Sequence, residues 1–476
     1  MSSTKKITFL ILLGFLLTKG IAQDLAGTPA AKRVKEVIEL LNGTSSYKLE
    51  DYVNNQYAPG FRDAFPLEAH KGIFQTTQTM FGKVNLVAII KTIPNEISIV
   101  LKSETKDAWL NLSLLVESDA PHRIVSIVFR PEQPPNTSRN EKKAQFSNLE
   151  ELHQYLLKKS NVNEFSGVLM IAKNGTPIFK EAYGYASKEN DISNKIDTKF
   201  NLGSINKTFT TVAIAQLMEK GELSIDDPIG KYLDMFPRNI AEKVTIRHLL
   251  NMRSGWGDYW SNEYYIANKD KLMSVSDYMD FIEDLPLDFE PGTNFQHSNT
   301  GYEVAGAIIE KISSMDYFDY IKKNIYEAAG MTNSDSYFRD NPIENRASGY
   351  SGMTPSGQVN KAYKADNLDI LPPRGTPAGG GYSTIEDILK FDKALRSGKL
   401  LNTEYTQYVI NRLKGSPDDQ HLFPKTTYRA AGRAPGVITF LGMDFQSSYS
   451  IIVLSNYDNN VAMEIAEEIL NMLGLD

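Results

Sequence analysis

Strand-like segments at both ends of the stretch from residue 148 to residue 476 constrain the fold more than any other feature. After a helical pattern at 149–158, two apolar runs at 168–172 and 178–185 flank the dipeptide Asn174-Gly175. An Asn-Gly dipeptide between two such runs is a strong signal for a β-hairpin. The long stretch therefore begins, after one helix, with two antiparallel strands.

The far end of the same stretch mirrors this beginning. Residues 437–444 and 450–455 have the pattern of strands, and residues 461–473 have that of an amphipathic helix. Residues 200–400 are mostly helical or irregular by pattern. The simplest architecture is α+β, with one antiparallel sheet built from both ends, helices on its faces and a helical region inserted between them.

A smaller domain is expected before this stretch. Prolines 131, 134 and 135, followed by a polar run, predict a linker at 131–147. Residues 23–130 then form a separate α+β unit. Its expected elements are a helix at 30–41 and strands at 84–90, 97–102, 109–116 and 124–129. One long helix with an antiparallel sheet resembles, in its element order, the nuclear-transport-factor-like fold. The residues of this unit contain no catalytic cluster, so we expect a structural or pocket-bearing accessory domain.

The first residues have the pattern of a secretory signal peptide. Lys5 and Lys6 precede an apolar run at 7–17, and Gly20-Ile21-Ala22 places small residues at a cleavage site. The run is too short for a bilayer span of ~20 residues. We therefore expect residues 1–22 to be removed and the mature chain, without a membrane span, to be periplasmic or extracellular.

Composition excludes several kinds of function. The chain has no cysteine, which rules out disulfides, thiolate metal sites and a cysteine nucleophile. Its net charge of −7 argues against a nucleic-acid surface. No cluster has metal-ligand spacing and no phosphate-binding loop is present, so no metal and no cofactor are expected.

Ser204 and Lys207 form the first candidate site. Apolar residues at helical spacing over 205–217 place Ser204 in the first turn of a buried helix, with Lys207 one turn later on the same face. A lysine held neutral by burial can take a serine's proton, and a helix N-terminus suits an oxyanion. The alternative is an N-cap serine followed by a solvated lysine. The Ser-x-x-Lys tetrapeptide alone does not distinguish these two alternatives, because the same spacing occurs at four other serines: Ser2, Ser3, Ser45 and Ser103.

The surrounding segments resemble those of the serine β-lactamase and penicillin-binding-protein superfamily, especially its class C, D-aminopeptidase and esterase branch. They are FNLGSINKTF at 200–209, LSIDDPI at 223–229, VTIRHLL at 244–250, PGTNFQHSNTGY at 291–302 and PAGGGYST at 377–384. The resemblance implies a β-lactamase-like domain over 148–476, with Ser204 as nucleophile and Lys207 as its base.

Two motifs depart from the family pattern. The family's Tyr-x-Asn is His297-Ser298-Asn299 here, and its Lys-Thr-Gly or His-x-Gly is Ala430-Ala431-Gly432. We expect His297 to replace the tyrosine as a proton relay, with activity falling at mildly acidic pH because histidine titrates near ~6.5. The alternative is that His297 only packs beside the site.

The loss of a basic residue at position 430 changes the expected substrate. Alanine cannot bind a substrate carboxylate, although Arg429 or Arg433 remains a possible source of positive charge. The resemblance also implies an oxyanion hole from the backbone N–H groups of Ser204 and Arg433, next to Gly432, and a substrate contact from the Asn299 amide.

These features predict a secreted serine hydrolase that acts on a small or peptide-like ester or amide, with esterase activity favoured over β-lactamase activity. Two alternatives stay open. One is a D-amino-acid peptidase or penicillin-binding protein, and the other is a binding protein on a degraded hydrolase scaffold.

Overall fold

The computed structural model describes residues 27–62, 67–117, 119–132, 145–352, 365–411 and 427–475. The predicted signal peptide and most of the predicted linker lie outside these ranges. In the described parts of the chain, no helix combines the length and apolarity needed to cross a bilayer. The chain divides into two compact units, Met1–Lys143 and Ala144–Asp476.

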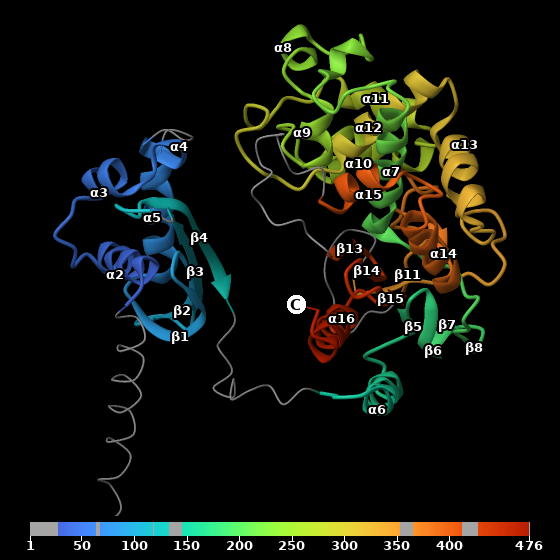
Figure 1. Cartoon of the computed structure of the whole chain (residues 1–476), viewed down its shortest axis with the longest axis horizontal. Helices are drawn as coiled ribbons and strands as arrows, with labels where there is room; N and C mark the ends of the chain where they lie inside the picture. Colours follow the sequence, from blue (N-terminus) through green and yellow to red (C-terminus); the bar gives the residue numbers. More distant parts are fainter. Residues whose placement is uncertain are drawn as a thin grey trace, which may run out of the picture. The chain divides into compact units, whose positions relative to one another are not determined.

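The N-terminal unit consists of helices followed by a four-stranded antiparallel meander, β1-β2-β3-β4 (Figure 1). The four predicted strands are present, at Val84–Ile93, Glu96–Ser103, Trp109–Val116 and Ile124–Glu132. The helix predicted at 30–41 is α2, and three further helices were not predicted. The helices are α2 (Pro29–Asn42), α3 (Leu49–Gln56), α4 (Pro59–Arg62) and α5 (Leu67–Phe81). A nuclear-transport-factor-like assignment of this unit stays a prediction.

The C-terminal unit is built on a five-stranded antiparallel sheet in the order β13-β14-β15-β5-β6, which confirms that both ends of the stretch share one sheet. Figure 1 shows the teal-green strands β5 and β6 beside the red C-terminal strands. The predicted segments are confirmed, and β13, which has no continuous apolar run, was not predicted. The strands are β5 (Gly167–Lys173), β6 (Thr176–Tyr183), β13 (Thr427–Ala434), β14 (Val437–Asp444) and β15 (Tyr449–Ser455).

Both faces of this sheet are covered. Along β5, Val168 and Met170 belong to the core on the side of the helical region, whereas Leu169 and Ile171 belong to the core under α6 (Leu149–Asn161) and α16 (Val461–Leu473). Successive side chains of a strand point to opposite faces, so a strand covered on both sides is apolar throughout. This explains the continuous apolar run at 168–172.

The helical region between the strands contains the candidate site. Its most buried helix, α7 (Asn206–Glu219), follows a short 3₁₀ turn, η1 (Gly203–Ile205). The other helices are η2 (Ile229–Lys231), α8 (Arg238–Ala241), α9 (Ile246–Leu250), η3 (Tyr259–Ser261), α10 (Glu263–Asn268), η4 (Lys269–Lys271), α11 (Val275–Ile282), α12 (Thr300–Ser313), α13 (Tyr317–Ile321), the π-helical η5 (Lys322–Glu327), α14 (Ile385–Arg396) and α15 (Thr403–Ile410). Short strands are β7 (Tyr185–Ser187), β8 (Ile192–Ser193), β9 (Phe200–Asn201), β10 (Tyr350–Ser351), β11 (Ala365–Asp366) and β12 (Tyr382–Ser383).

Candidate active site

Ser204 lies on the turn that leads into α7, and it is the only partly accessible residue between positions 200 and 217. The glycine-rich segment at 379–381 packs against the backbone of this turn. Gly380 N–H donates to Gly203 O at 3.2 Å, and a Cβ on Gly381 would lie 2.6 Å from Asn206 Oδ1. This tight backbone packing fixes the partly accessible serine at the start of the helix, where it lines the cavity.

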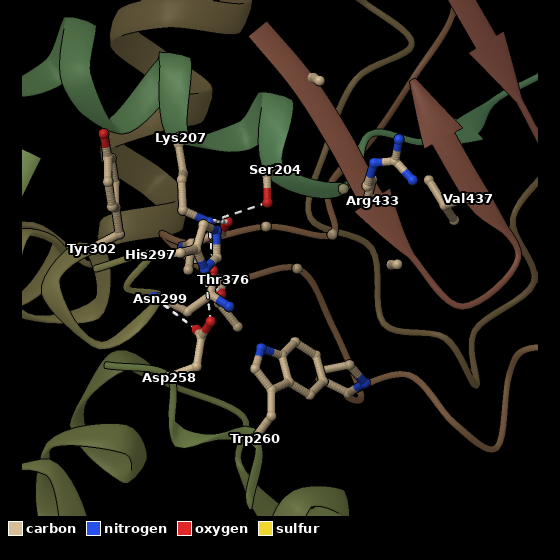
Figure 2. Close-up of a pocket in the computed structure, with 18 of the residues that line it drawn as sticks. Ser204, Lys207, Asp258, Trp260, His297, Asn299, Tyr302, Thr376, Arg433 and Val437 are labelled. Atoms are coloured by element: carbon tan, nitrogen blue, oxygen red, sulfur yellow. Dashed lines mark hydrogen bonds and ion pairs between the residues drawn. The ribbon is translucent and has the colours of Figure 1, made fainter. Parts of the chain in front are cut away.

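Lys207 lies one turn further along, and its ammonium group points to Ser204 (Figure 2). Its Nζ is 3.2 Å from Ser204 Oγ, 2.5 Å from Asn299 Oδ1 and 2.5 Å from Ala378 O. The residue is only 7% exposed, and burial lowers the pKa of Lys207 to about 8 against the opposing negative charges of Glu303 and Asp258. The alternative of a solvated lysine is therefore wrong. A buried amine beside an accessible hydroxyl has the arrangement of a base and its nucleophile.

The second motif approaches the same lysine from the N-terminal end of α12. Asn299 Oδ1 accepts a hydrogen bond from Lys207 Nζ. His297 lines the same cavity but is turned toward Asp258, with its Nδ1 2.6 Å from Asp258 Oδ2. Among the residues that the structure describes, no hydrogen bond joins the His297 ring to Ser204 or Lys207. Its role as a proton relay stays a prediction.

Asp258 was missed by the sequence reasoning. Its second carboxylate oxygen accepts the backbone N–H of Asn299 at 2.9 Å, so one carboxylate holds two residues of the motif. Although burial opposes ionisation, the hydrogen bonds from His297 and Asn299 keep the pKa of Asp258 below its usual range. The available signal was its position eight residues after the family-like segment VTIRHLL at 244–250.

A second carboxylate, Glu303, lies beneath the site on α12. It is completely buried, and its Oε1 accepts hydrogen bonds from Tyr259 OH at 2.9 Å and from Thr376 Oγ1 at 2.7 Å. Burial raises the pKa of Glu303 to about 7. The sequence reasoning did not single out this residue, because a glutamate in an amphipathic helix ordinarily faces solvent.

The third motif lies on β13, an edge strand that passes beside the nucleophile turn. A Cβ on Gly432 would lie 2.1 Å from Leu202 O, and a Cβ on Gly203 would lie 3.0 Å from Arg433 N. The Arg433 backbone nitrogen is therefore next to the turn that carries Ser204, which is the placement expected of an oxyanion-hole donor. Glycine at both positions is required by this close approach.

The two arginines of this strand are engaged with the C-terminal segment. Arg433 Nη1 donates to Asn460 Oδ1 at 2.9 Å, and Arg429 Nη2 donates to Leu475 O at 2.5 Å. Both residues still line the cavity. Their guanidinium groups are thus held beside α16, whereas Ala430 occupies the position of the basic residue of the family.

A cavity of about 1760 Å³ is lined by Ser204, Lys207, Asp258, His297 and Asn299. The mouth of the cavity has three exposed apolar residues. Trp260 is 41% exposed, and Ile266 and Phe295 are each 61% exposed. Several cations of the cavity wall are already paired with acids: Arg247 with Asp226, and Arg339 and Lys269 with Asp270. The cavity therefore offers an apolar entrance to a polar catalytic floor.

Comparisons with known proteins show which family and fold this chain resembles. The Beta-lactamase family model matches residues 159–473. Penicillin-binding protein 4* of Bacillus subtilis (strain 168) is 36% identical over 333 residues, which cover 64% of this chain and 71% of that protein. The crystal structure of a penicillin binding protein from Bacillus halodurans is 29% identical, with a TM-score of 0.59, and covers 67% of this chain and 98% of its own. The D-amino acid amidase of Ochrobactrum anthropi SV3, at 23% identity and a TM-score of 0.57 over 68% of this chain and 99% of its own, shares the fold.

Proposed function

The chain belongs to the β-lactamase family of serine hydrolases, and on that premise we propose that it cleaves neutral esters or amides through an acyl-enzyme on Ser204. One observation carries the proposal. The accessible Ser204 hydroxyl lies 3.2 Å from the buried Nζ of Lys207, whose pKa burial lowers to about 8. Such a lysine is neutral often enough at neutral pH to act as a base.

The proposed acylation uses groups that already meet at the site. Ser204 Oγ attacks the substrate carbonyl carbon while Lys207 Nζ takes the hydroxyl proton. The backbone N–H groups of Ser204 and Arg433 stabilise the oxyanion, and the Asn299 amide holds both the lysine and the substrate. The leaving alcohol or amine takes a proton from the Lys207 ammonium, and water then hydrolyses the acyl-enzyme.

A neutral substrate is favoured by the third motif and by the cavity wall. Ala430 cannot bind a carboxylate, and the guanidinium groups of Arg429 and Arg433 donate to the C-terminal segment. The apolar mouth of the cavity, with Trp260 and Phe295, suits a bulky apolar group on the substrate. We therefore propose esterase activity on hydrophobic esters as the main reaction.

A second candidate, a penicillin-reactive peptidase, is supported by the 36% identity to a penicillin-binding protein. Intact-protein mass spectrometry separates the two. We expect a fluorophosphonate to add to Ser204 and a penicillin not to do so, whereas adducts from both probes would favour the second candidate. Folded protein that reacts with neither probe would refute both and favour a binding protein on this scaffold.

Two variants make this experiment specific. Ser204→Ala should abolish the fluorophosphonate adduct. Ser45→Ala removes the serine of another Ser-x-x-Lys tetrapeptide, outside the hydrolase domain, and should leave the adduct unchanged. Peptide mapping of the labelled wild-type protein should place the adduct on residue 204, and an adduct elsewhere would contradict the assignment.

We also propose that the chain is exported and cleaved after Ala22, on the evidence of its N-terminal pattern. Mass spectrometry of the protein isolated from its native cells should find an N-terminus at Gln23 outside the cytoplasm. Full-length protein in the cytoplasm would contradict this proposal.

A further inference from the structure

Asp258 connects two members of the second motif, and this contact suggests a function for a residue that the family resemblance did not identify. We propose that Asp258 is a positioning residue that keeps His297 in the tautomer protonated on Nδ1, so that Nε2 remains free to accept a proton in the cavity. The inference rests on the proposed function and extends it to the water-dependent step.

The two oxygens of the Asp258 carboxylate have different donors. Oδ2 lies 2.6 Å from His297 Nδ1, and Oδ1 accepts the Asn299 backbone N–H at 2.9 Å. Both donors belong to the same three-residue segment. The carboxylate thus fixes the imidazole ring relative to Asn299, which in turn contacts Lys207.

The segment is also held through the residue before Asp258. Ser298 Oγ donates to Gly257 O at 3.1 Å, and Thr300 Oγ1 donates to the same carbonyl at 2.8 Å. Residues 257–258 and 297–300 therefore form one hydrogen-bonded unit. Three of the four contacts hold the backbone segment that carries His297, and the fourth joins its ring to the Asp258 carboxylate.

The chemistry of imidazole then determines which nitrogen can accept a proton. A neutral ring has one N–H, and a carboxylate can only accept, so the ring nitrogen facing Asp258 is the protonated one. The side chain of His297 is 52% exposed and lines the cavity with Ser204, whereas Asp258 is less exposed at 32%. Figure 2 shows His297 above Asp258 on the same side of the pocket as Lys207.

This arrangement suits the hydrolysis of the acyl-enzyme. His297 Nε2 would take one proton from water as the water oxygen bonds to the acyl carbon. The bond from that carbon to Ser204 Oγ then breaks, and the same proton passes to Oγ. One water is consumed, and a carboxylic acid and free serine are formed.

The Asp258→Asn variant tests the proposal because an amide offers only one oxygen. It can accept from Asn299 N–H with its oxygen and then presents an NH₂ group to His297, which forces Nδ1 to accept and Nε2 to carry the proton. Asp288→Asn is the matched control. Asp288 is an exposed carboxylate that contacts Gln296 Nε2 at 3.1 Å and does not line the cavity.

The tautomer can be measured directly by long-range ¹H–¹⁵N correlation on full-length protein with ¹⁵N-labelled histidine, with the His297 signals assigned from a His297→Gln variant. Wild type and Asp288→Asn should have a protonated Nδ1, and Asp258→Asn a protonated Nε2. A wild-type ring protonated on Nε2, or no change in Asp258→Asn, would overturn the proposal. If Asp258→Asn does not fold, the His297 tautomer measured in the wild-type protein still tests the proposal.

Kinetics with a p-nitrophenyl ester test the consequence. The initial burst should persist in Asp258→Asn and His297→Gln, while the steady-state rate falls by about 100-fold in each. The double variant should be no slower than His297→Gln. Equal loss of burst and steady state, or full additivity, would overturn the role in deacylation. Absence of any adduct on Ser204 would instead refute the proposed function. The NMR measurement of the His297 tautomer would still test whether Asp258 positions His297.

Discussion

Asn299→Asp is expected to raise the pKa of Lys207 and to slow attack by Ser204 at neutral pH. Asn299 Oδ1 lies 2.5 Å from Lys207 Nζ, so an aspartate of the same shape places a negative charge against the ammonium. At an effective dielectric constant near 20, opposite charges ~4 Å apart attract by about 4 kcal/mol, which equals about three pKa units. Desolvation of the new carboxylate opposes part of this shift, so we expect at least one unit.

A rise of one unit in the pKa of Lys207 already has a large effect on the acylation rate. With the pKa of Lys207 at about 8, about one lysine in ten is neutral at pH 7, and a shift of one unit reduces this to about one in a hundred. The pKa of Lys207 rises, and does not fall, because the negative charge at position 299 favours the protonated lysine. The rate of Ser204 acylation at pH 7 should therefore fall about tenfold or more.

The assay is the rate of fluorophosphonate labelling between about pH 5.5 and 10, a range that spans the titration of a lysine at this pKa. The wild-type rate should rise about tenfold per unit at low pH and level off above about 8. Asn299→Asp should move this midpoint upward. Asn294→Asp adds the same charge at an exposed position of the same segment and should not move it. Coincident midpoints in wild type and Asn299→Asp, or a wild-type midpoint near ~6.5, typical of histidine, would refute the assignment of Lys207 as the base.

Three further results are expected. Because burial raises the pKa of Glu303 from 4.5 to about 7, its stabilising contribution is complete below about pH 4.5 and is lost as pH rises through 7. Denaturant titrations should show a loss of roughly 3 kcal/mol in wild type that is absent in Glu303→Gln. Gly432→Ala places a methyl group 2.1 Å from Leu202 O, so it should lower the free energy of unfolding by about 1–3 kcal/mol and abolish labelling of Ser204. Trp260→Ala should raise KM for aromatic esters about tenfold, which corresponds to about 1.4 kcal/mol of apolar contact, and leave KM for acetate esters unchanged.

Features that depend on local pattern were predicted well from the sequence. Strand β6 is mostly exposed and was predicted from the Asn174-Gly175 hairpin signal. Strands β5, β14 and β15 were predicted because they are buried on both faces and must be apolar along their length. The turn at Ser204 and the buried helix after it were predictable for the same reason. The resemblance of the surrounding segments then placed Lys207 and Asn299 at the same site, where the structure brings them together.

Features that depend on tertiary contacts were not predicted. Helix α5 contains Gly72 and a run of threonines and glutamines, which weaken its helical pattern. Strand β13 is an edge strand of small and basic residues, and only its pairing with β14 identifies it. Asp258 contacts His297, which lies 39 residues later in the sequence, and no local sequence pattern predicts such a contact.

The pairing of the two ends of the C-terminal unit also sets when the candidate site can be completed. Register joins Ile171 of β5 to Ile451 of β15, and β13 brings Arg433 beside the turn of Ser204. A ribosome finishes Ser204 and Lys207 long before it adds these C-terminal strands. A growing chain therefore holds Ser204 and Lys207 without the central strand of the sheet and without the backbone nitrogen of Arg433, since such distant pairings form only when both partners exist. The order of synthesis therefore allows the candidate site to be completed only after β13, β14 and β15 have been made.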